Sequence, residues 1–169
     1  YQCDWSSDVC SSDLGAITDA GLLDDDDLRV IEDSILKPTL HGCQKEGLAF
    51  RGVLFIGLMM TKDGPKVLEY NLRFGDPETQ AILVRLETDI VDICRAMLGA
   101  DGATLDGAPI AWKPGSSACV VMSAEGYPRE VRKGDAIEGL AAAKAVADVN
   151  VFQSGTDTAA DGQIGRAHV

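Results

Sequence analysis

The chain has little positive charge and no long apolar segment. Fifteen lysines and arginines stand against 27 aspartates and glutamates, which gives a formal net charge of -12 at pH 7. A surface this acidic argues against nucleic acid as a partner. No uninterrupted apolar stretch is long enough to cross a bilayer, and no N-terminal residues read as a cleavable signal. We therefore expect a cytoplasmic protein with neither nucleic acid nor a membrane as its partner.

The chain also lacks any pattern of cysteine and histidine with the spacing of metal ligands. Cys43, Cys94 and Cys119 have no C-x-x-C pairing and no histidine nearby at such a spacing. His41 has no evident partner that would make it a base or support a nucleophile. Cys94 and Cys119 lie in apolar contexts, so we predict small core residues in a reducing compartment.

The two ends of the chain are related at the level of codons. Residues 164–169 can be encoded by a sequence whose reverse complement translates as residues 8–13. Unrelated termini should not match over six consecutive codons. We interpret residues 1–14 and 163–169 as translated sequencing adapter, and residues 15–162 as an internal fragment of a longer protein.

An acidic run followed by apolar residues predicts the first helix. The run 24–27 is entirely aspartate, and apolar residues recur at helical spacing from 28 to 36. Negative charge in a first turn complements the helix dipole, so we favour a helix start over a metal cluster. Pro38 is expected to end or kink this helix, and Gly42 supports its termination.

A hairpin is predicted next. Residues 52–60 are apolar at nearly every position, as expected of a strand covered on both faces. The sequence Asp-Gly-Pro at 63–65 supplies a turn, and residues 66–71 read as the partner strand.

Glu69, Asn71 and Arg73 occupy alternate positions at the exit of that strand. Alternate residues of an extended strand lie on one side, so we expect the three side chains to emerge together. A carboxylate and an amide oxygen can hold Mg²⁺ whose other ligands are phosphate oxygens and water. An arginine beside them could neutralise a phosphoryl group in transfer. The alternative is a surface ion pair of Glu69 with Arg73, with Asn71 merely ending the strand.

The residues after this motif predict two helices. Asp76-Pro77 resembles an N-cap with proline at the first helical position, followed by a helix over 78–85. A second helix is expected over 89–98, and residues 99–116 read as a linker with at most a short strand at 109–112.

The segment that follows the linker opens with a further strand. Residues 117–124 are a buried-strand candidate. Strands and helices in this mixture place the chain in the α/β (α+β) class.

Residues 52–80 closely resemble the phosphoribosylamine-glycine ligase family of the ATP-grasp superfamily. The resemblance rests on Gly-Leu-Met at 57–59, the turn at 62–67, the E-x-N-x-R set and Arg-Phe-Gly-Asp-Pro-Glu-Thr-Gln at 73–80. E-x-N-x-R alone would indicate only an ATP-grasp enzyme, whereas the continuation is much more specific.

This resemblance implies a domain organisation. Residues 15–98 would be the C-terminal part of an ATP-grasp domain, 99–116 a linker, and 117–162 a truncated small C-terminal domain. A similar strand and G-Y-P turn, here at 126–128, open that domain in the family. The lobe that grips the ATP phosphates would lie outside this chain, so we expect the chain alone to have no ligase activity.

The resemblance also implies a reaction. Glycine would be joined to 5-phosphoribosylamine through a glycyl phosphate in purine biosynthesis, with ATP cleaved to ADP and phosphate. Glu69 and Asn71 would bind Mg²⁺ or Mn²⁺ at the ATP phosphates, and Arg73 would be the catalytic residue that stabilises the transferring phosphoryl group. Asp76 and Glu78 would orient substrate or metal-bound water, although a helix cap and a first-turn acid explain them equally well.

Two other functions fit part of the pattern. A different ATP-grasp carboxylate-amine ligase would share E-x-N-x-R, but the 73–80 continuation and the G-Y-P turn argue against it. A non-catalytic ATP-grasp-like binding module would be expected to have lost one of the three metal and phosphate residues, and all three are present.

Overall fold

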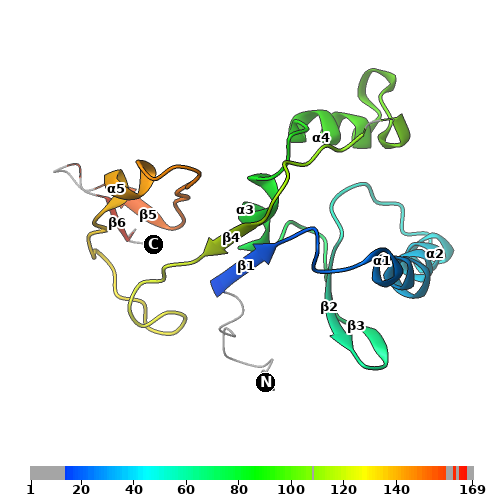
Figure 1. Cartoon of the computed structure of the whole chain (residues 1–169), viewed down its shortest axis with the longest axis horizontal. Helices are drawn as coiled ribbons and strands as arrows, with labels where there is room; N and C mark the ends of the chain where they lie inside the picture. Colours follow the sequence, from blue (N-terminus) through cyan, green and yellow to red (C-terminus); the bar gives the residue numbers. More distant parts are fainter. Residues whose placement is uncertain (1–13, 108, 159–161, 163, 167–169) are drawn as a thin grey trace. The chain divides into compact units, whose positions relative to one another are not determined.

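The computed structural model describes residues 14–107, 109–158, 162 and 164–166 (Figure 1). These residues fall into two compact units. The larger unit is Ile17–Ala118, and the other combines the residues up to Ala16 with those from Cys119 onward. Among the described helices, none has the length and apolar character that crossing a bilayer requires.

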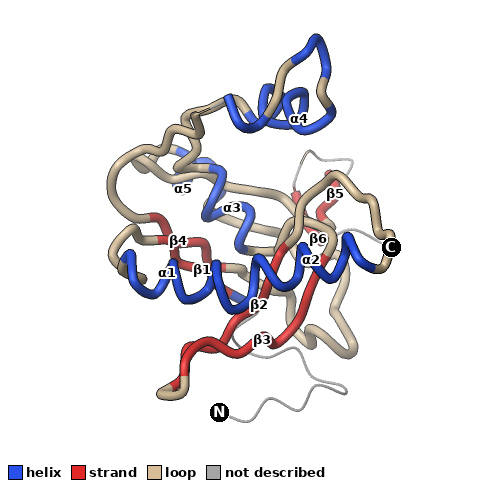
Figure 2. Tube along the Cα trace, turned by 90° about the vertical axis from the view of Figure 1, so that its right-hand side faces the viewer, coloured by secondary structure: helices blue, strands red, loops and turns tan. Residues whose placement is uncertain are grey.

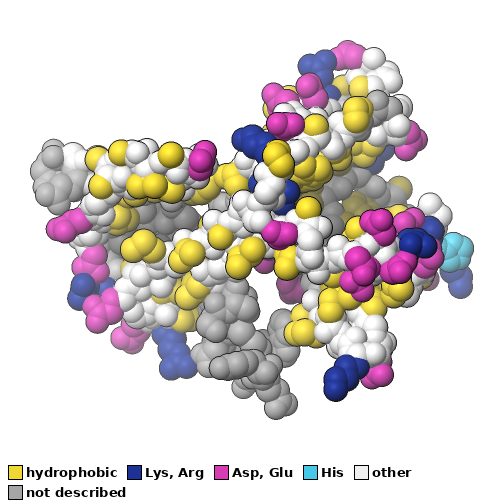
Figure 3. All heavy atoms as spheres, in the orientation of Figure 1, with side chains coloured by type: hydrophobic (Ala, Val, Ile, Leu, Met, Phe, Trp, Pro, Cys, Tyr) yellow, Lys and Arg dark blue, Asp and Glu magenta, His cyan; other side chains and the backbone are white. Residues whose placement is uncertain are grey.

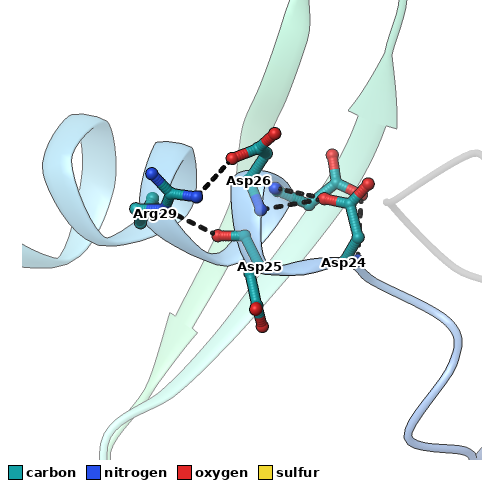
Figure 4. A network of polar contacts seen from close by, with 5 residues as sticks. Asp24, Asp25, Asp26 and Arg29 are labelled. Atoms are coloured by element: carbon teal, nitrogen blue, oxygen red, sulfur yellow. Dashed lines mark hydrogen bonds and ion pairs between the residues drawn. The ribbon is translucent and has the colours of Figure 1, made fainter.

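The first helix begins at the acidic run, as predicted. Helix α1 spans Asp25–Ile31, and Asp24 is its N-cap. The Asp24 carboxylate accepts the backbone N–H groups of Asp26 and Asp27 at 2.9 and 2.8 Å, and the Asp27 carboxylate accepts the Asp24 N–H (Figure 4). This reciprocal capping box satisfies donors that the first helical turn leaves open.

The expected effect of Pro38 is only partly correct, because the helix is distorted there but does not end. A π-helical turn, Glu32–Leu36, connects α1 directly to α2, Lys37–Lys45, which carries Pro38 in its first turn. The Lys37 N–H bonds to the carbonyl of Glu32, five residues back. A proline ring collides with the carbonyl four residues earlier in a regular α-helix, so a wider turn just before it relieves the conflict.

The expected termination at Gly42 is wrong. Gly42 lies inside α2, which continues to Lys45. Gly47, two residues beyond, has a φ of +71°, the left-handed conformation that commonly follows a helix end. The residue that marks the end of this helix is therefore Gly47, which adopts the left-handed conformation, and not Gly42.

The predicted hairpin is confirmed, with its turn placed differently. Strands β2, Phe55–Thr61, and β3, Gly64–Asn71, pair antiparallel. Gly64, with φ +88°, already pairs with Thr61, so the turn is formed by residues 62 and 63. The helix α1–α2 lies beside the hairpin in both views (Figures 1 and 2), and α1 contacts β3.

The expectation that the first strand is covered on both faces is wrong. In the described part of the chain, β2 and β3 form a sheet of two strands. Met59 and Met60 of β2 are 52% and 43% exposed, and Leu68 of β3 is 46% exposed. An apolar strand becomes covered on both faces only where layers pack on both sides of its sheet.

Two further helices complete the larger unit. Helix α3 spans Glu78–Leu83, and α4 spans Ile90–Leu98. Asp89 caps α4 by accepting the Val91 N–H at 2.8 Å, as the predicted start requires. Beyond α4 the chain forms two short 3₁₀ turns, Ala100–Gly102 and Leu105–Gly107.

The last predicted strand is shorter and more exposed than expected. Strand β4, Ser117–Val120, pairs with β1, Gly15–Thr18, in a sheet of two strands. Val120 is 78% exposed and Met122, beyond the strand, is 94% exposed. The short strand expected at 109–112 reduces to a single bridge between Trp112 and Leu86.

A polar network lies at the start of β4. The Ser117 hydroxyl donates to the carbonyl of Ala81 at 2.5 Å and lies 2.7 Å from the Thr18 hydroxyl. The neighbouring Ser116 hydroxyl donates to Asp19, and this bond, followed by the backbone N–H of Gly21, holds the pKa of Asp19 below its ordinary value.

The smaller unit is built from short elements. Helix α5 spans Leu140–Lys144, and strands β5, Thr156–Thr158, and β6, Ile164–Arg166, pair antiparallel. The turn at Gly126 requires glycine, because its φ is +85° and a Cβ there would lie 1.9 Å from the Glu130 carbonyl oxygen.

Few hydrophobic side chains are buried among the described residues. Ile35, Ala81 and Ala96 are buried, and Pro77 is the largest fully buried side chain. Figure 3 shows hydrophobic side chains spread over the visible face of the molecule. Two of these buried residues, Pro77 and Ala81, lie at α3, which begins five residues after Arg73.

Candidate functional site

Glu69 and Asn71 come together at the end of β3, as the strand alternation predicts. The Asn71 amide donates from Nδ2 to Glu69 Oε1 at 2.9 Å. Both residues pair with β2, since Glu69 lies opposite Gly57 and Asn71 opposite Phe55. The strand pairing therefore fixes their backbone positions, while their oxygen-bearing side chains share one face.

A β-bulge precedes Glu69. Gly57 pairs with Glu69 and Leu58 pairs with Val67, so Leu68 is the additional residue on β3. A bulge changes which face the following side chains occupy and increases the local twist. The orientation of Glu69 and Asn71 is thus set by the bulge as well as by simple alternation.

Arg73 is not on the strand with the other two residues. Strand β3 ends at Asn71 and the chain bends at positions 72 and 73. The Arg73 guanidinium donates from Nη1 to the carbonyl of Phe74 at 2.9 Å. The expectation that all three side chains share one side of a single strand is therefore wrong for Arg73, because the backbone is no longer extended there.

Asp76 is not the N-cap of α3. Pro77 occupies that position, and it follows a cis Asp76-Pro77 peptide bond. The Asp76 carboxylate instead accepts the Gln80 amide, from Nε2 to Oδ1, at 2.7 Å. The Asp-Pro pair thus lies one position earlier relative to the helix than the sequence suggested, and Gln80 holds the carboxylate.

Glu78 is the first residue of α3, so the interpretation as a first-turn acid is confirmed. Its side chain folds back over Gly75, where a Cβ would lie only 2.3 Å from Glu78 Oε2. The Thr79 hydroxyl and backbone N–H both donate to the Gly75 carbonyl, at 2.5 and 3.3 Å. The Glu78 carboxylate therefore occupies the space that a side chain at position 75 would take.

Sequence reasoning assigned no role to Gln80 or Gly75. Gln80 could have been found from its spacing, because residues four apart in a helical turn lie on one face. Its Oε1 atom is buried and has no hydrogen-bond partner among the described residues, while its Nε2 atom donates to Asp76. No sequence pattern indicates the role of Gly75, because that role depends on a contact with the Glu78 side chain.

The donor set at the end of β3 fits a hard divalent cation. A carboxylate and an amide oxygen are both oxygen ligands, and Asn71 Oδ1 accepts no hydrogen bond from the described residues. Mg²⁺ is commonly held by one or two protein oxygens, with phosphate and water completing its shell. No group of three or more histidine, cysteine and acidic side chains in the described part of the chain would form a metal cage.

Comparison with known proteins gives concordant results. Residues 6–79 match the family described as phosphoribosylglycinamide synthetase, ATP-grasp (A) domain. The phosphoribosylamine-glycine ligase of Rhodopirellula baltica is 44% identical over 151 residues, which cover 89% of this chain and 34% of that protein. The chain belongs to the phosphoribosylamine-glycine ligase family.

Other relatives span bacteria, plants and animals. The phosphoribosylamine-glycine ligase of Vigna unguiculata is 42% identical over 89% of the chain and 48% of its own length. A trifunctional purine biosynthetic protein of Gallus gallus is 43% identical over 85% of the chain and 14% of its own length.

The fold comparison agrees with these sequences. The crystal structure of the Thermotoga maritima phosphoribosylamine-glycine ligase matches with a TM-score of 0.67 and 30% identity, over 92% of this chain and 36% of that one. The predicted α/β class is confirmed. The chain spans about a third of the length of the bacterial ligases it matches.

Proposed function

We propose that this chain supplies the metal-binding end of strand β3, and the phosphate-binding arginine that follows it, to a cytoplasmic phosphoribosylamine-glycine ligase. The observation that carries the proposal is the contact of Asn71 with Glu69 at the end of β3, within a sequence 44% identical to such a ligase. Family membership supports the reaction, and the paired oxygen ligands support a part in handling ATP.

The chemistry requires activation of a carboxylate. Glycine's carboxylate is a poor electrophile, so its oxygen first attacks the γ-phosphorus of ATP, releasing ADP and forming glycyl phosphate. The amine of 5-phosphoribosylamine then attacks the glycyl carbonyl, and the carbon-oxygen bond to phosphate breaks. The products are glycinamide ribonucleotide, ADP and phosphate.

Glu69 and Asn71 would hold Mg²⁺ or Mn²⁺, which when bound neutralises charge on the ATP phosphates. Their hydrogen bond orients the pair before any ligand arrives, because the amide N–H group is committed to Glu69 and the amide oxygen is left for a cation. Preorganisation of this kind lowers the cost of binding.

Arg73 would stabilise the transferring phosphoryl group. In this structure it is exposed and bonds to the Phe74 carbonyl. One hydrogen bond contributes about 1 kcal/mol, and an exposed guanidinium can replace it with water. Turning Arg73 toward a phosphate beside Asn71 therefore costs little compared with the charge-assisted bonds it would gain.

Asp76 and Glu78 would face the substrates as an acidic pair. Gln80 holds the Asp76 carboxylate, and the Glu78 carboxylate is seated at Gly75. Both acids therefore have defined positions, three and five residues after Arg73. An amine substrate, or water bound beside the phosphates, would find hydrogen-bond acceptors there.

The test is a chimeric enzyme. Residues 15–162 of this chain would replace the matching segment of the Rhodopirellula baltica ligase, and ADP and glycinamide ribonucleotide would be measured with glycine, 5-phosphoribosylamine and MgATP. We expect glycine-dependent turnover whose activation by Mg²⁺ is weakened by Glu69→Gln. Turnover that prefers another carboxylic acid would assign the segment to a different ATP-grasp ligase.

The control distinguishes a loss of chemistry from a loss of fold. Glu87 is an exposed carboxylate outside the motif, so Glu87→Gln in the same chimera should leave turnover unchanged. A folded chimera that binds ATP but turns over no acid would contradict the proposal and favour a binding module. The 169-residue chain alone, assayed in parallel, is expected to give no turnover.

A further inference from the structure

A glycine lies directly beneath the side chain of Glu69. Gly57 of β2 is the cross-strand partner of Glu69, next to the bulge. A Cβ placed on Gly57 would lie 3.0 Å from Glu69 Cγ, and 3.7 and 3.8 Å from its backbone N and O atoms. The space that a side chain at position 57 would occupy is therefore taken by the methylene groups of Glu69.

This arrangement determines where the Glu69 carboxylate lies. Directly paired residues carry their side chains on the same face of a sheet, with Cβ atoms about 4.5–5.5 Å apart. With no side chain opposite, Glu69 can lean across β2 and still receive the Asn71 amide at 2.9 Å. A side chain at position 57 would push Glu69 Cγ away and lengthen or break that bond.

We propose that Gly57 is a positioning residue for the cation site, acting through Glu69 and not by touching the ion. The inference rests on the proposed function, since it matters only if Glu69 and Asn71 bind the metal. It assigns to Gly57 a role that the hairpin alone does not require: its φ is not in the left-handed region, so alanine is acceptable to the backbone.

The experiment uses the 169-residue chain and Mn²⁺ as the probe. Paramagnetic broadening of the amide signals of Glu69 and Asn71 reports Mn²⁺ bound at this site and not elsewhere on an acidic protein. Gly57→Ala is expected to weaken this binding by about tenfold, the lower end of the loss when a partner that orients a metal ligand is removed. The matched control is Gly52→Ala, because a Cβ at Gly52 has no neighbour within 4 Å.

A double-mutant cycle separates positioning from general damage. Once Glu69→Gln has removed the ligand charge, adding Gly57→Ala should cause no further loss of Mn²⁺ affinity. Fully additive losses would overturn the inference, because Gly57 would then act independently of Glu69. Unchanged affinity in Gly57→Ala would overturn it as well.

The same data distinguish this inference from the proposed function. If Glu69→Gln leaves the broadening unchanged, the metal role of Glu69 fails and the inference fails with it. If Glu69→Gln weakens Mn²⁺ binding while Gly57→Ala does not, only the inference is overturned.

A measurement on the unchanged protein avoids any dependence on folding of the variant. A nuclear Overhauser contact between the Gly57 α-protons and the Glu69 γ-protons is expected both without metal and with Mg²⁺. Its absence from the Mg²⁺-bound protein would overturn the inference, since Glu69 would then bind the ion from another position.

Discussion

The acidic run at 24–27 and the acidic motif at 69–78 use their carboxylates differently. In the first, Asp24 and Asp27 accept backbone N–H groups in a capping box, and Asp26 pairs with Arg29 at 2.5 Å. In the second, the described residues give Glu69 a single partner, the Asn71 amide. A high density of acids is thus weak evidence of a binding site. A carboxylate beside a second oxygen ligand, as Glu69 lies beside the Asn71 amide, is better evidence.

The largest expected effect concerns the two arginines that accompany these acidic segments. Arg73→Ala in the chimeric ligase should lower kcat by about 10³-fold, because an arginine that stabilises a transferring phosphoryl group contributes on that scale. Arg29→Ala, which removes the exposed pair with Asp26 and the hydrogen bond to the Asp25 carbonyl, should leave kcat unchanged. Steady-state kinetics of both variants would test this difference. Equal losses of kcat would contradict a specific role for Arg73.

The next effect separates the carboxylates themselves. Glu69→Gln should weaken activation of the chimera by Mg²⁺ by at least about 10-fold, since losses of 10–100-fold follow even when residues that only support a metal ligand are removed. Asp25→Asn removes a charge from the helix start and should not change the Mg²⁺ dependence. If Asp25→Asn were as damaging as Glu69→Gln, overall negative charge and not a defined site would be attracting the ion.

The helix start should affect stability and not chemistry. Asp24→Ala should lower the free energy of unfolding by about 1 kcal/mol, because it removes the N-cap of α1. Asn can accept the same backbone bonds, so Asp24→Asn should be nearly neutral. Urea denaturation of the unchanged chain and the two variants measures the difference. An unchanged free energy of unfolding in Asp24→Ala would show that the capping box contributes nothing.

Glu78 provides an intermediate case. Gly75→Ala should displace the Glu78 carboxylate while changing the free energy of unfolding by less than about 0.5 kcal/mol, because the closest atom is the far end of a flexible side chain. Side-chain NMR shifts of Glu78 and urea denaturation would test the two halves of this statement. A large loss of stability would show that the backbone at position 75, and not Glu78, requires glycine.

The smallest effect concerns a carboxylate held by a hydroxyl. The pKa of Asp19 is lowered chiefly by the hydrogen bond from Ser116, so Ser116→Ala should raise it toward the ordinary value. A depressed carboxyl pKa contributes stability above the unfolded pKa that is lost as pH falls through the folded pKa. Ser116→Ala should therefore reduce the acid sensitivity of stability. An NMR titration of Asp19 that is unchanged in the variant would contradict this.

The sequence predicted features that follow from backbone periodicity. The start of α1, the β2–β3 pairing, α4 and the shared face of Glu69 and Asn71 all depend on local patterns, and the structure confirms them. The α/β class was predicted from the mixture of strands and helices along the chain, and the family from residues 52–80.

The features that were predicted wrongly depend on contacts beyond local pattern. Strand alternation could not place Arg73, because the chain bends after Asn71. Capping propensity could not place Asp76, because Pro77 occupies the cap and Gln80 takes the carboxylate. Coverage of β2 on both faces could not be read from its composition, since it depends on which elements pack against the sheet.

The most direct test is a Mn²⁺ titration of the 169-residue chain followed by paramagnetic broadening of its amide signals, residue by residue. The account expects the signals of Glu69 and Asn71 to broaden at lower Mn²⁺ concentrations than those of Asp25 and Asp26. Equal broadening at the two segments, or stronger broadening at the helix start, would contradict the claim that the end of β3 is the cation site.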